Sequence, residues 1–562
     1  MNFAYRAGEI NKYIINIRRH IHAHPELSFN ERKTTAYIAD RLEEMGVEVQ
    51  RFDDYTGCIG TIRGRNGGKT VLLRADIDAL PIKECSGVEF ESENDGAMHA
   101  CGHDCHTAML LGAAKLLSEH KDELRGTVKL LFQAAEECFV GSHYYWDNGH
   151  LGGIDAAMGM HVWPTVESGR MAIVDGYLMA SCDNFRITVR GRGAHSMTPQ
   201  LGRDAVAAAA AVIREVQTIA ARMNKPDSPL VISIGTVESE RVDGRICERV
   251  SMEGTFRAFD IRSQRLALEM IEHIADSAAA IYGCTAEFEH TFSGYAVNNR
   301  DTALNALACD AARKLFGEDV LQTTEKAMGS EDFAYIMERI PSSLFVFLGC
   351  RDEKAGSTHP VHNEKFRINE DILHIGAAEY AQFAFDYLEQ TANGTFISAV
   401  GEHEYVPVMR MDKPHKDAEL LLPFDGDTQS GLPRYRGRFT MEIAGKAAHG
   451  SAPQDGHDAA LAAADAIAAL GYIVSRQNDP LDALTITVNG FNAGAKLNIL
   501  AGNAVLNGEY GCNSVELFAD AMQCIKTSAT NAAAVNGCSI SAVFGEAEHE
   551  EIYSCSFGRP IV

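Results

Sequence analysis

Residues 98–106 concentrate side chains that bind metal ions. The segment reads MHACGHDCH, so it holds two thiols, three imidazoles and one carboxylate. Thiolates and imidazoles are the ligands that zinc and similar metals favour in proteins. A metal site needs ligands that converge from separate loops, and residues of suitable chemistry follow further along the chain: Glu136, Glu137, His161 and His362. The sequence therefore predicts a metal site to which this segment contributes.

Strands and helices alternate around this segment. Apolar positions recur with a helical period over residues 10–45, and short β-rich runs follow. A helix is predicted at 107–118 and a strand at 127–132. This alternation favours an α/β sheet with helices on its faces. Motifs at the carboxyl ends of strands in such a sheet lie where ligands bind.

A different pattern begins near residue 182 and occurs twice. Four short strands and two helices between 182 and 296 predict a small β-α-β-β-α-β domain. The motif GRGAHSMTPQ at 191–200 returns as GKAAHGSAPQ at 445–454, and the same offset of 254 relates Gly254 to Gly508. A constant offset over so many positions indicates an internal repeat.

Eight segments, in family order, resemble the M20 metallopeptidase family, and specifically its amidohydrolase branch of aminoacylases, hippurate hydrolases and auxin-conjugate hydrolases. The matching segments are His20–Ser28, Leu73–Pro81, Met98–Thr107, Gln133–Glu137, Gly159–Pro164, Gly193–Pro199, Met328–Phe333 and His362–Phe366. In combination and in this order they are far more specific than any single motif.

The resemblance implies a site with two divalent metal ions. Carried over by motif, its ligands are Cys101, His103, Glu137, His161 and His362. Cys101 is expected to bridge the two ions, which are zinc or manganese, with cobalt and nickel as further possibilities.

Glu136 is expected to be the general base. Paired metals polarise an amide carbonyl and lower the pKa of a bound water. A carboxylate that lies beside this water without binding metal accepts its proton and passes it to the leaving amine. Asp76 and Asp78 are candidates to orient a ligating histidine.

The predicted fold is α/β, with a two-metal catalytic domain (a mixed sheet flanked by helices), an inserted β-α-β-β-α-β lid domain and a second, C-terminal copy of this lid. The predicted boundaries are 1–181 and 297–391 for the catalytic domain, 182–296 for the first lid, 392–435 for a connector and 436–562 for the second lid.

Of three positions that matter in the family, the two lids share one and differ at the other two. The resemblance implies homodimers, in which each active site borrows a His and an Asn from the partner's lid and uses an Arg of its own lid to bind the substrate carboxylate. The first lid has His195 and Arg257 but Gly244 at the Asn position, whereas the second has His449 and Asn498 but Gly511 at the Arg position.

This complementary loss suggests that the second lid replaces the dimer partner within one chain. His449 and Asn498 then stabilise the oxyanion, Arg257 binds the carboxylate, and the protein is a monomer with pseudo-dimeric lids. The alternative is an ordinary homodimer active through His195, with the tail as a decaying duplication or an added surface for oligomerisation.

Composition limits the partners of the protein. The net charge of −26 argues against nucleic acid and anionic membranes. Fourteen cysteines are too few for a disulfide framework. The N-terminal segment is charged where a signal peptide is apolar, and the apolar stretch near 205–213 is too short to span a bilayer. We expect a cytoplasmic protein without a nucleic-acid or membrane partner.

The expected function is hydrolysis of the amide bond of N-acyl amino acids. A dipeptidase or carboxypeptidase of the same family is the alternative, because its substrates also carry an amide beside a free carboxylate. A non-catalytic binding protein ranks lower, since the chain retains Glu136 and all five ligand positions. The stretch Cys138–Val140 and the aromatic run Tyr144–Trp146 depart from the usual pattern and could reshape the acyl site.

Overall fold

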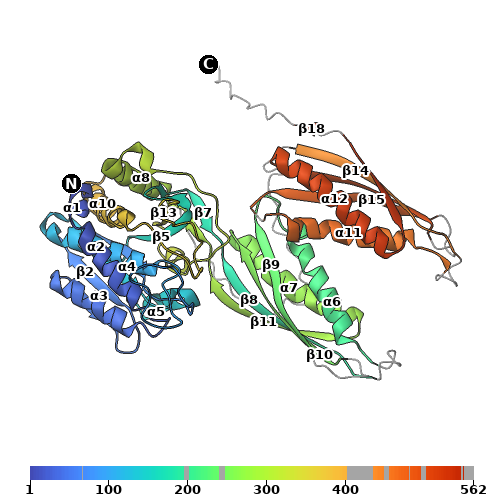
Figure 1. The fold of residues 1–562 in the computed structure, drawn as a ribbon, viewed down its shortest axis with the longest axis horizontal. Helices are drawn as coiled ribbons and strands as arrows, with labels where there is room; N and C mark the ends of the chain where they lie inside the picture. Colours follow the sequence, from blue (N-terminus) through green and yellow to red (C-terminus); the bar gives the residue numbers. More distant parts are fainter. Residues whose placement is uncertain are drawn as a thin grey trace, which may run out of the picture. The chain divides into compact units, whose positions relative to one another are not determined.

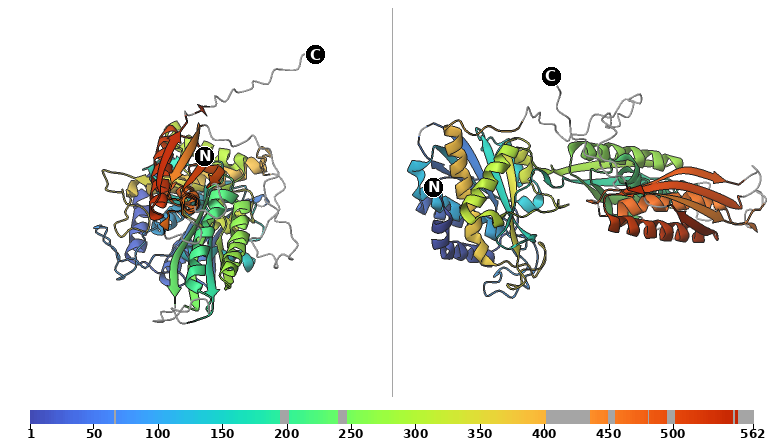
Figure 2. Two further views of the ribbon diagram at one scale, coloured as in Figure 1. Left: turned by 90° about the vertical axis from the view of Figure 1, so that its right-hand side faces the viewer. Right: turned by 90° about the horizontal axis from the view of Figure 1, so that it is seen from above.

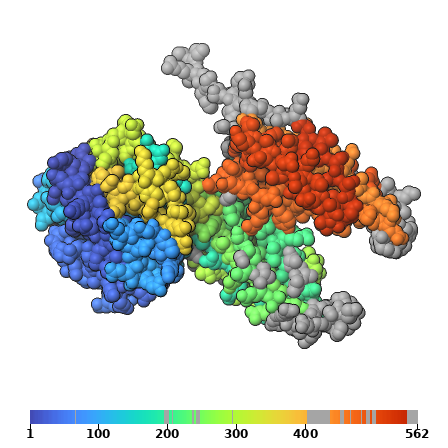
Figure 3. All heavy atoms as spheres, viewed as in Figure 1, coloured from blue at the N-terminus to red at the C-terminus, as the bar shows by residue number. Residues whose placement is uncertain are grey.

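The computed structural model describes residues 1–65, 67–194, 202–239, 247–400, 435–448, 455–479, 481–494, 501–545 and 548–549. The chain forms two compact units. The first unit contains Met1–Cys182 and the described residues from Ser293 to position 400. The second unit contains Asp183–Phe292 and the described residues after position 434. In Figure 3 the yellow atoms of the segment that re-enters the first unit after Ser293 lie against the blue atoms of the N-terminal segment. The domain boundaries given above stay predictions.

A seven-stranded mixed sheet forms the centre of the first unit. Its order is β1 (Glu48–Arg51), β2 (Cys58–Arg63), β4 (Gly126–Gln133), β3 (Lys69–Asp76), β5 (Ala156–Glu167), β13 (Ser343–Arg351) and β6 (Met171–Ala172). Strand β3 pairs in parallel with β4 and β5, and β5 pairs in parallel with β13. The carboxyl ends of these four strands therefore meet at one edge. The predicted α/β fold with a mixed sheet is confirmed.

Helices cover the sheet of the first unit (Figure 1). Helices α4 and α10 both pack against β3, α2 packs on α4, α8 packs on α10, and α3 packs on β1 and β2. The helices of this unit are α1 (Ala4–Glu9), α2 (Asn11–Ala23), α3 (Arg32–Glu44), α4 (His103–Glu119), α5 (Gly141–Asp147), α8 (Thr302–Phe316), α9 (Phe333–Met337) and α10 (Leu373–Ala392). Helix α4 begins four residues before its predicted start at 107, because Gly102 takes a left-handed conformation (φ 93°) that turns the metal-binding segment directly into the helix.

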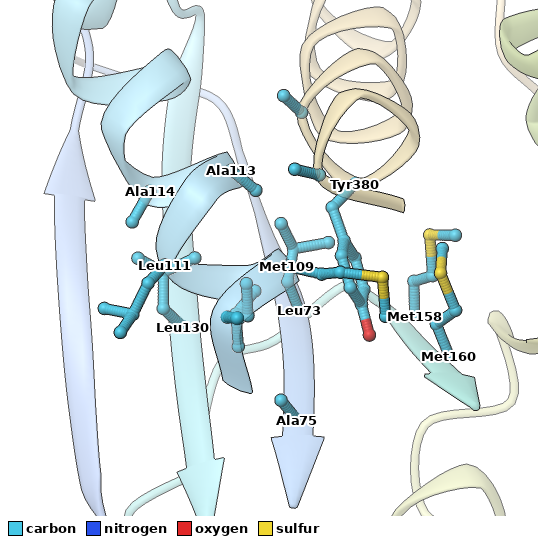
Figure 4. Close-up of a cluster of buried hydrophobic side chains, with 14 of the residues drawn as sticks. Leu73, Ala75, Met109, Leu111, Ala113, Ala114, Leu130, Met158, Met160 and Tyr380 are labelled. Atoms are coloured by element: carbon cyan, nitrogen blue, oxygen red, sulfur yellow. The ribbon is translucent and has the colours of Figure 1, made fainter. Parts of the chain in front are cut away.

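The main core lies between α4, α10 and the central strands. Figure 4 shows Met109 of α4 beside Leu73 of β3 and Tyr380 of α10, while Leu111 of the same helix lies on the side away from Tyr380. All four side chains are fully buried, and burial of each stabilises the fold by about 1.5–3 kcal/mol. The Tyr380 hydroxyl donates to the carbonyl oxygen of Arg74 at 2.7 Å. The core thus fixes β3, which ends at Asp76, and α4, which begins at His103.

A short two-stranded sheet lies where the chain leaves and re-enters the first unit. It pairs β7 (Gly176–Met179) with β12 (Val297–Asn299) in antiparallel fashion. The chain between these strands belongs largely to the second unit.

The second unit contains two sets of elements in the same order. The first set is β8 (Cys182–Arg190), α6 (Ala205–Glu215), β9 (Leu230–Ser239), β10 (Arg249–Ala258), α7 (Ile261–Ile281) and β11 (Thr285–Gly294). The second set is β14 (Tyr435–Ala444), α11 (Ala459–Tyr472), β15 (Leu484–Ala493), β16 (Asn503–Cys512), α12 (Val515–Val535) and β17 (Ser539–Phe544), and β18 (Glu548–His549) also pairs with β14. Figure 2 shows the helices gathered on one face of each sheet.

The sheets of the two sets have equivalent strand orders. They are β11-β8-β10-β9 and β17-β14-β16-β15, so β9 and β15 are edge strands at the same position. Equivalent helices also begin alike: Asp260 accepts hydrogen bonds from backbone N–H groups at the start of α7, and Ser514, 254 positions later, accepts one at the start of α12. Such caps satisfy donors that have no partner within the helix.

The two sets contact each other through equivalent arginines. The Arg222 guanidinium donates to the carbonyl oxygen of Ile486. Arg476, which lies 254 positions later, donates from Nε to Gln217 Oε1 at 2.9 Å and from Nη1 to Ser233 Oγ at 3.2 Å. Burial lowers the pKa of both arginines. Reciprocal contacts of this kind are typical of an interface between two copies of one domain.

The segment Ala459–Gln477 is apolar and long enough to cross a membrane, by length and composition only. It is longer than the stretch near 205–213 singled out in the sequence. Its residues Ala462, Ala466 and Leu470 are buried in the core of the second set, as in a core helix of a globular domain.

Candidate active site

All five predicted metal ligands lie together in the first unit. Cys101 lies two residues before α4 and His103 begins this helix, His161 lies in β5, and Glu137 lies in the turn Glu136–Cys138 after β4. His362 lies in the loop between β13 and α10. Ligand atoms of Cys101, His103 and His161 lie within 4.8 Å of one another, and the same holds for Cys101, Glu137 and His362. Cys101 is therefore common to two groups that could each hold a metal ion.

The free atoms of this cluster fit metal ions. The buried atoms His103 Nε2 and Glu137 Oε1 have no hydrogen-bond partner in the described part of the chain. His161 Nδ1 lies 2.7 Å from the carbonyl oxygen of Val162, and its Nε2 contacts a further predicted ligand atom, Cys101 Sγ, at 3.4 Å. Buried polar atoms are normally paired, so these atoms indicate a ligand that they would bind in common.

Asp78 holds two of the predicted ligands in place. Its Oδ1 lies 3.1 Å from His103 Nδ1, and its Oδ2 accepts from the Glu137 backbone N–H at 3.0 Å and from Ser28 Oγ at 2.7 Å. Burial alone would raise the pKa of Asp78, but these donors lower it. The carboxylate fixes the His103 ring so that Nε2 faces the cluster, as such partners do for metal-bound histidines.

His106 is a site residue that sequence analysis did not single out. It lies in the same nine-residue segment, and with Asp76 and His103 it forms a further group that could hold a metal. However, His106 Nδ1 lies 2.6 Å from Asp76 Oδ1, and its Nε2 accepts from the Val162 backbone N–H. Both ring nitrogens are used, so His106 connects β3 with β5.

Glu136 lies beside the ligand cluster and is nearly buried. Its Oε2 lies 3.9 Å from His103 Nε2, and its Oε1 accepts from the Asp332 backbone N–H at 3.3 Å. Burial, followed by the charges of Glu331 and Glu137, raises the pKa of Glu136 well above its usual range. A carboxylate with a raised pKa binds a proton readily, which suits a general base.

A buried charge cluster lies beside Glu136, and of its members sequence analysis gave a role only to Asp76. The Arg74 guanidinium contacts Asp76 at 2.7 Å, Glu331 at 2.8 Å and Asp332 at 3.0 Å. All four side chains are at most 1% exposed. The motif at 328–333 pointed to the segment but not to Arg74 as its partner.

Backbone strain is concentrated at this site. In the described ranges, the non-glycine residues with positive φ are Phe29 (67°), Ala135 (57°), Phe139 (56°) and His362 (62°). Phe29 follows Ser28, which bonds to Asp78; Ala135 and Phe139 flank the Glu136–Cys138 turn; and His362 is a predicted ligand. Such conformations cost about 1–3 kcal/mol each and cluster at functional sites.

Of the predicted lid residues, one lies in the second unit and the others lie outside the described residues. Arg257 lies in the second unit, on β10 opposite Val231 of β9, and is half-buried. His195, His449, Asn498 and Gly244 lie outside the described residues, so their predicted roles stay predictions.

Two family models match the chain. Peptidase family M20/M25/M40 matches residues 72–386, and the peptidase dimerisation domain matches residues 434–535. The second match falls on the second set of elements in the second unit.

Relatives with known names cover about two thirds of the chain. Thermostable carboxypeptidase 2 of Saccharolobus solfataricus is 38% identical, and the match covers 67% of this chain and 96% of that protein. N-acetylcysteine deacetylase of Bacillus subtilis is also 38% identical over 67% of this chain and 97% of its own length.

The solved structure of a Bacillus subtilis protein described as a dinuclear metal-binding peptidase of the M20 family is 36% identical. Its TM-score is 0.61, and the match covers 68% of this chain and 99% of that one. The resemblance predicted from the eight motifs is confirmed. The chain belongs to peptidase family M20/M25/M40 and is a hydrolase of amide or peptide bonds.

Proposed function

We propose that the protein is a metal-dependent amidohydrolase that cleaves N-acyl amino acids into a carboxylate and a free amino acid. The observation that carries this proposal is the pair of ligand groups that share Cys101, with Glu136 adjacent but outside both groups. A relative of 38% identity is a deacetylase of an N-acetyl amino acid.

Each residue of the cluster has a role in this proposal. Cys101, His103, Glu137, His161 and His362 would hold two divalent ions, zinc or manganese, with cobalt and nickel as alternatives. When bound, these ions supply polarisation of the amide carbonyl and a water of lowered pKa. Glu136 accepts the proton of the attacking water and delivers it to the leaving nitrogen. Asp78 keeps His103 Nε2 directed at the cluster.

We further propose that the second set of elements acts as a built-in dimer partner. His449 and Asn498 would donate to the developing oxyanion, and Arg257 would bind the substrate carboxylate. Three observations support this. Arg222 and Arg476 make reciprocal contacts between the two sets. Residues 434–535 match a dimerisation domain. The matches to relatives cover almost the whole of each relative but only two thirds of this chain. A tethered partner acts at high effective concentration.

A carboxypeptidase or dipeptidase is the second candidate function. One relative is a carboxypeptidase of equal identity, and Arg257 suits any substrate with a free carboxylate next to the amide. A binding protein without activity is disfavoured by the retention of Glu136 beside the ligand groups.

Release of free amine from N-acyl amino acids and dipeptides, with added zinc or manganese, tests the reaction. Faster release from N-acyl amino acids supports the amidohydrolase, and faster release from dipeptides supports the second candidate. The matched variants His449→Ala and His195→Ala then test the built-in partner: we expect loss of turnover only in His449→Ala, with a monomer in light scattering. A dimer that depends on His195 and not on His449 contradicts it.

A further inference from the structure

Exposed apolar side chains gather beside the ligand cluster. In the described part of the first unit, three of the six exposed large apolar residues are Leu27, Phe29 and Val140, which are 37%, 46% and 40% exposed. Leu27 forms a bridge with Ala79, next to Asp78, and Val140 lies three residues after Glu137. Apolar surface next to a reaction centre is typical of a substrate-binding surface.

One carboxylate oxygen anchors both loops that carry these residues. Asp78 Oδ2 accepts from Ser28 Oγ at 2.7 Å and from the Glu137 backbone N–H at 3.0 Å. Phe29 follows the first anchor directly, and Phe139 comes two residues after the second. Both phenylalanines have positive φ, a conformation that bulky residues adopt only where the surroundings enforce it.

A third loop adds a stack of aromatic rings. The Tyr55 ring lies edge-on to Phe29, with 6.1 Å between centroids and 76° between planes. On its other side it stacks on Tyr144, at 3.9 Å and 9°. Burial, followed by the charge of Asp332, raises the pKa of Tyr55, which agrees with a ring close to the buried carboxylates around Glu136. The Tyr55 hydroxyl makes no hydrogen bond within the described ranges.

Buried hydrogen bonds tie the three loops into one rigid group. The buried Glu31 accepts from Thr56 Oγ1 at 2.6 Å and from the Ala135 backbone N–H at 2.9 Å. Tyr145 is fully buried; its hydroxyl donates to the Thr56 carbonyl oxygen at 2.8 Å and accepts from the Ala134 backbone N–H at 3.2 Å. Of the aromatic run predicted to reshape the acyl site, Tyr145 is thus part of the scaffold, whereas Tyr144 supports Tyr55.

We propose that Phe29 and Tyr55, called the aromatic surface below, contact the acyl group of the substrate and select N-aroyl and arylacetyl amino acids over N-acetyl ones. This inference rests on the proposed amidohydrolase function. An aromatic acyl group adds edge-to-face and stacked contacts to the rings of a preformed surface, whereas an acetyl group is too small to reach more than one of them. The rigid loops lower the entropy lost on binding.

The ratio of kcat/KM for N-benzoyl-alanine to that for N-acetyl-alanine tests the inference. We expect the zinc- or manganese-loaded enzyme to prefer the benzoyl substrate by about tenfold or more, and Phe29→Ala and Tyr55→Ala to lower this ratio by about tenfold. Tyr55→Phe keeps the ring and should hold the ratio within about threefold. Tyr5→Ala removes an aromatic residue that is 79% exposed in α1 of the same unit and is the matched control.

The two proposals fail in different ways. A wild-type enzyme that prefers N-acetyl-alanine, or a ratio unchanged in both Phe29→Ala and Tyr55→Ala, overturns the aromatic surface while the amidohydrolase function stands. Absence of turnover of every acyl amino acid overturns the proposed function instead. In that case calorimetry with N-benzoyl-alanine and N-acetyl-alanine decides: tighter benzoyl binding that Phe29→Ala and Tyr55→Ala both abolish supports the aromatic surface, and equal binding of the two compounds overturns it.

Discussion

Replacement of Arg74 should destabilise the first unit strongly. The side chain is fully buried and contacts three buried carboxylates, those of Asp76, Glu331 and Asp332. Removal of one partner from a buried ion cluster leaves uncompensated charge and costs about 3–5 kcal/mol. We therefore expect Arg74→Met, which keeps most of the side-chain volume, to lower the free energy of unfolding by about 3–5 kcal/mol near neutral pH.

The loss should depend on pH. Burial raises the pKa of Asp332 to about 7 in the folded protein, although Arg74 opposes this shift. Without Arg74 the pKa rises further, so protonation of Asp332 relieves the uncompensated charge. The folded variant then binds more protons than the unfolded chain, and its stability falls as pH increases. The difference between variant and wild type should therefore be smaller at about pH 5 than at about pH 8.

Tryptophan fluorescence during urea unfolding measures this effect in the first unit alone. The chain has two tryptophans, Trp146 in α5 and Trp163 in β5, and both belong to that unit. The matched control is Arg63→Met, because Arg63 and its partner Glu48 are both 66% exposed; such a pair contributes less than about 1 kcal/mol. A loss in Arg74→Met as small as that in the control would refute the reasoning.

Two further predictions concern a buried acid and the metal ions. Glu379 is fully buried, neither of its oxygens has a hydrogen-bond partner in the described residues, and burial raises its pKa well above the usual range. The free energy of unfolding should therefore fall as pH rises above about 4.5, since the folded state holds a proton that the unfolded state releases. In urea titrations, Glu379→Gln should flatten this fall and be more stable than wild type at about pH 8. An unchanged pH profile in this variant would contradict the prediction. Dialysis against a chelator should abolish amide hydrolysis and lower the midpoint of thermal unfolding, and zinc or manganese should restore both, with about two ions per chain by mass spectrometry. Cys101→Ser should bind fewer ions, whereas full occupancy in this variant would argue against a shared ligand.

The five candidate metal ligands could be named from the sequence because their side-chain types alone limit their chemistry. Cys101 and His103 lie two positions apart, and Glu137, His161 and His362 lie in motifs that are typical of the same family. The structure brings the five side chains together in two groups that share Cys101, and their binding of metal stays a prediction. The α/β fold could be predicted for a similar reason, since the alternation of strands and helices is a local pattern.

The charge cluster around Glu136 could not be predicted in this way. Arg74 and Glu331 are 257 positions apart, and nothing in either segment identifies the other as its partner. Their pairing depends on the return of the chain to the first unit after Ser293. Adjacent tyrosines raise a similar difficulty: successive helical residues point about 100° apart, so the sequence does not tell that Tyr145 faces inward while Tyr144 stacks on Tyr55.

The strained positions connect the site with the proposed specificity. Glycine adopts positive φ without strain, and among the described residues seventeen glycines do so. At Phe29 and Phe139 the chain instead keeps bulky side chains in this conformation, at a cost of about 1–3 kcal/mol each. At His362 the same cost is explained because this residue is itself a predicted metal ligand. Phe29 directly follows the anchor of Ser28 on Asp78 and is not needed to fill the core, since it is 46% exposed. The retained ring of Phe29, which lies edge-on to Tyr55, is therefore best explained by a contact that forms when substrate binds.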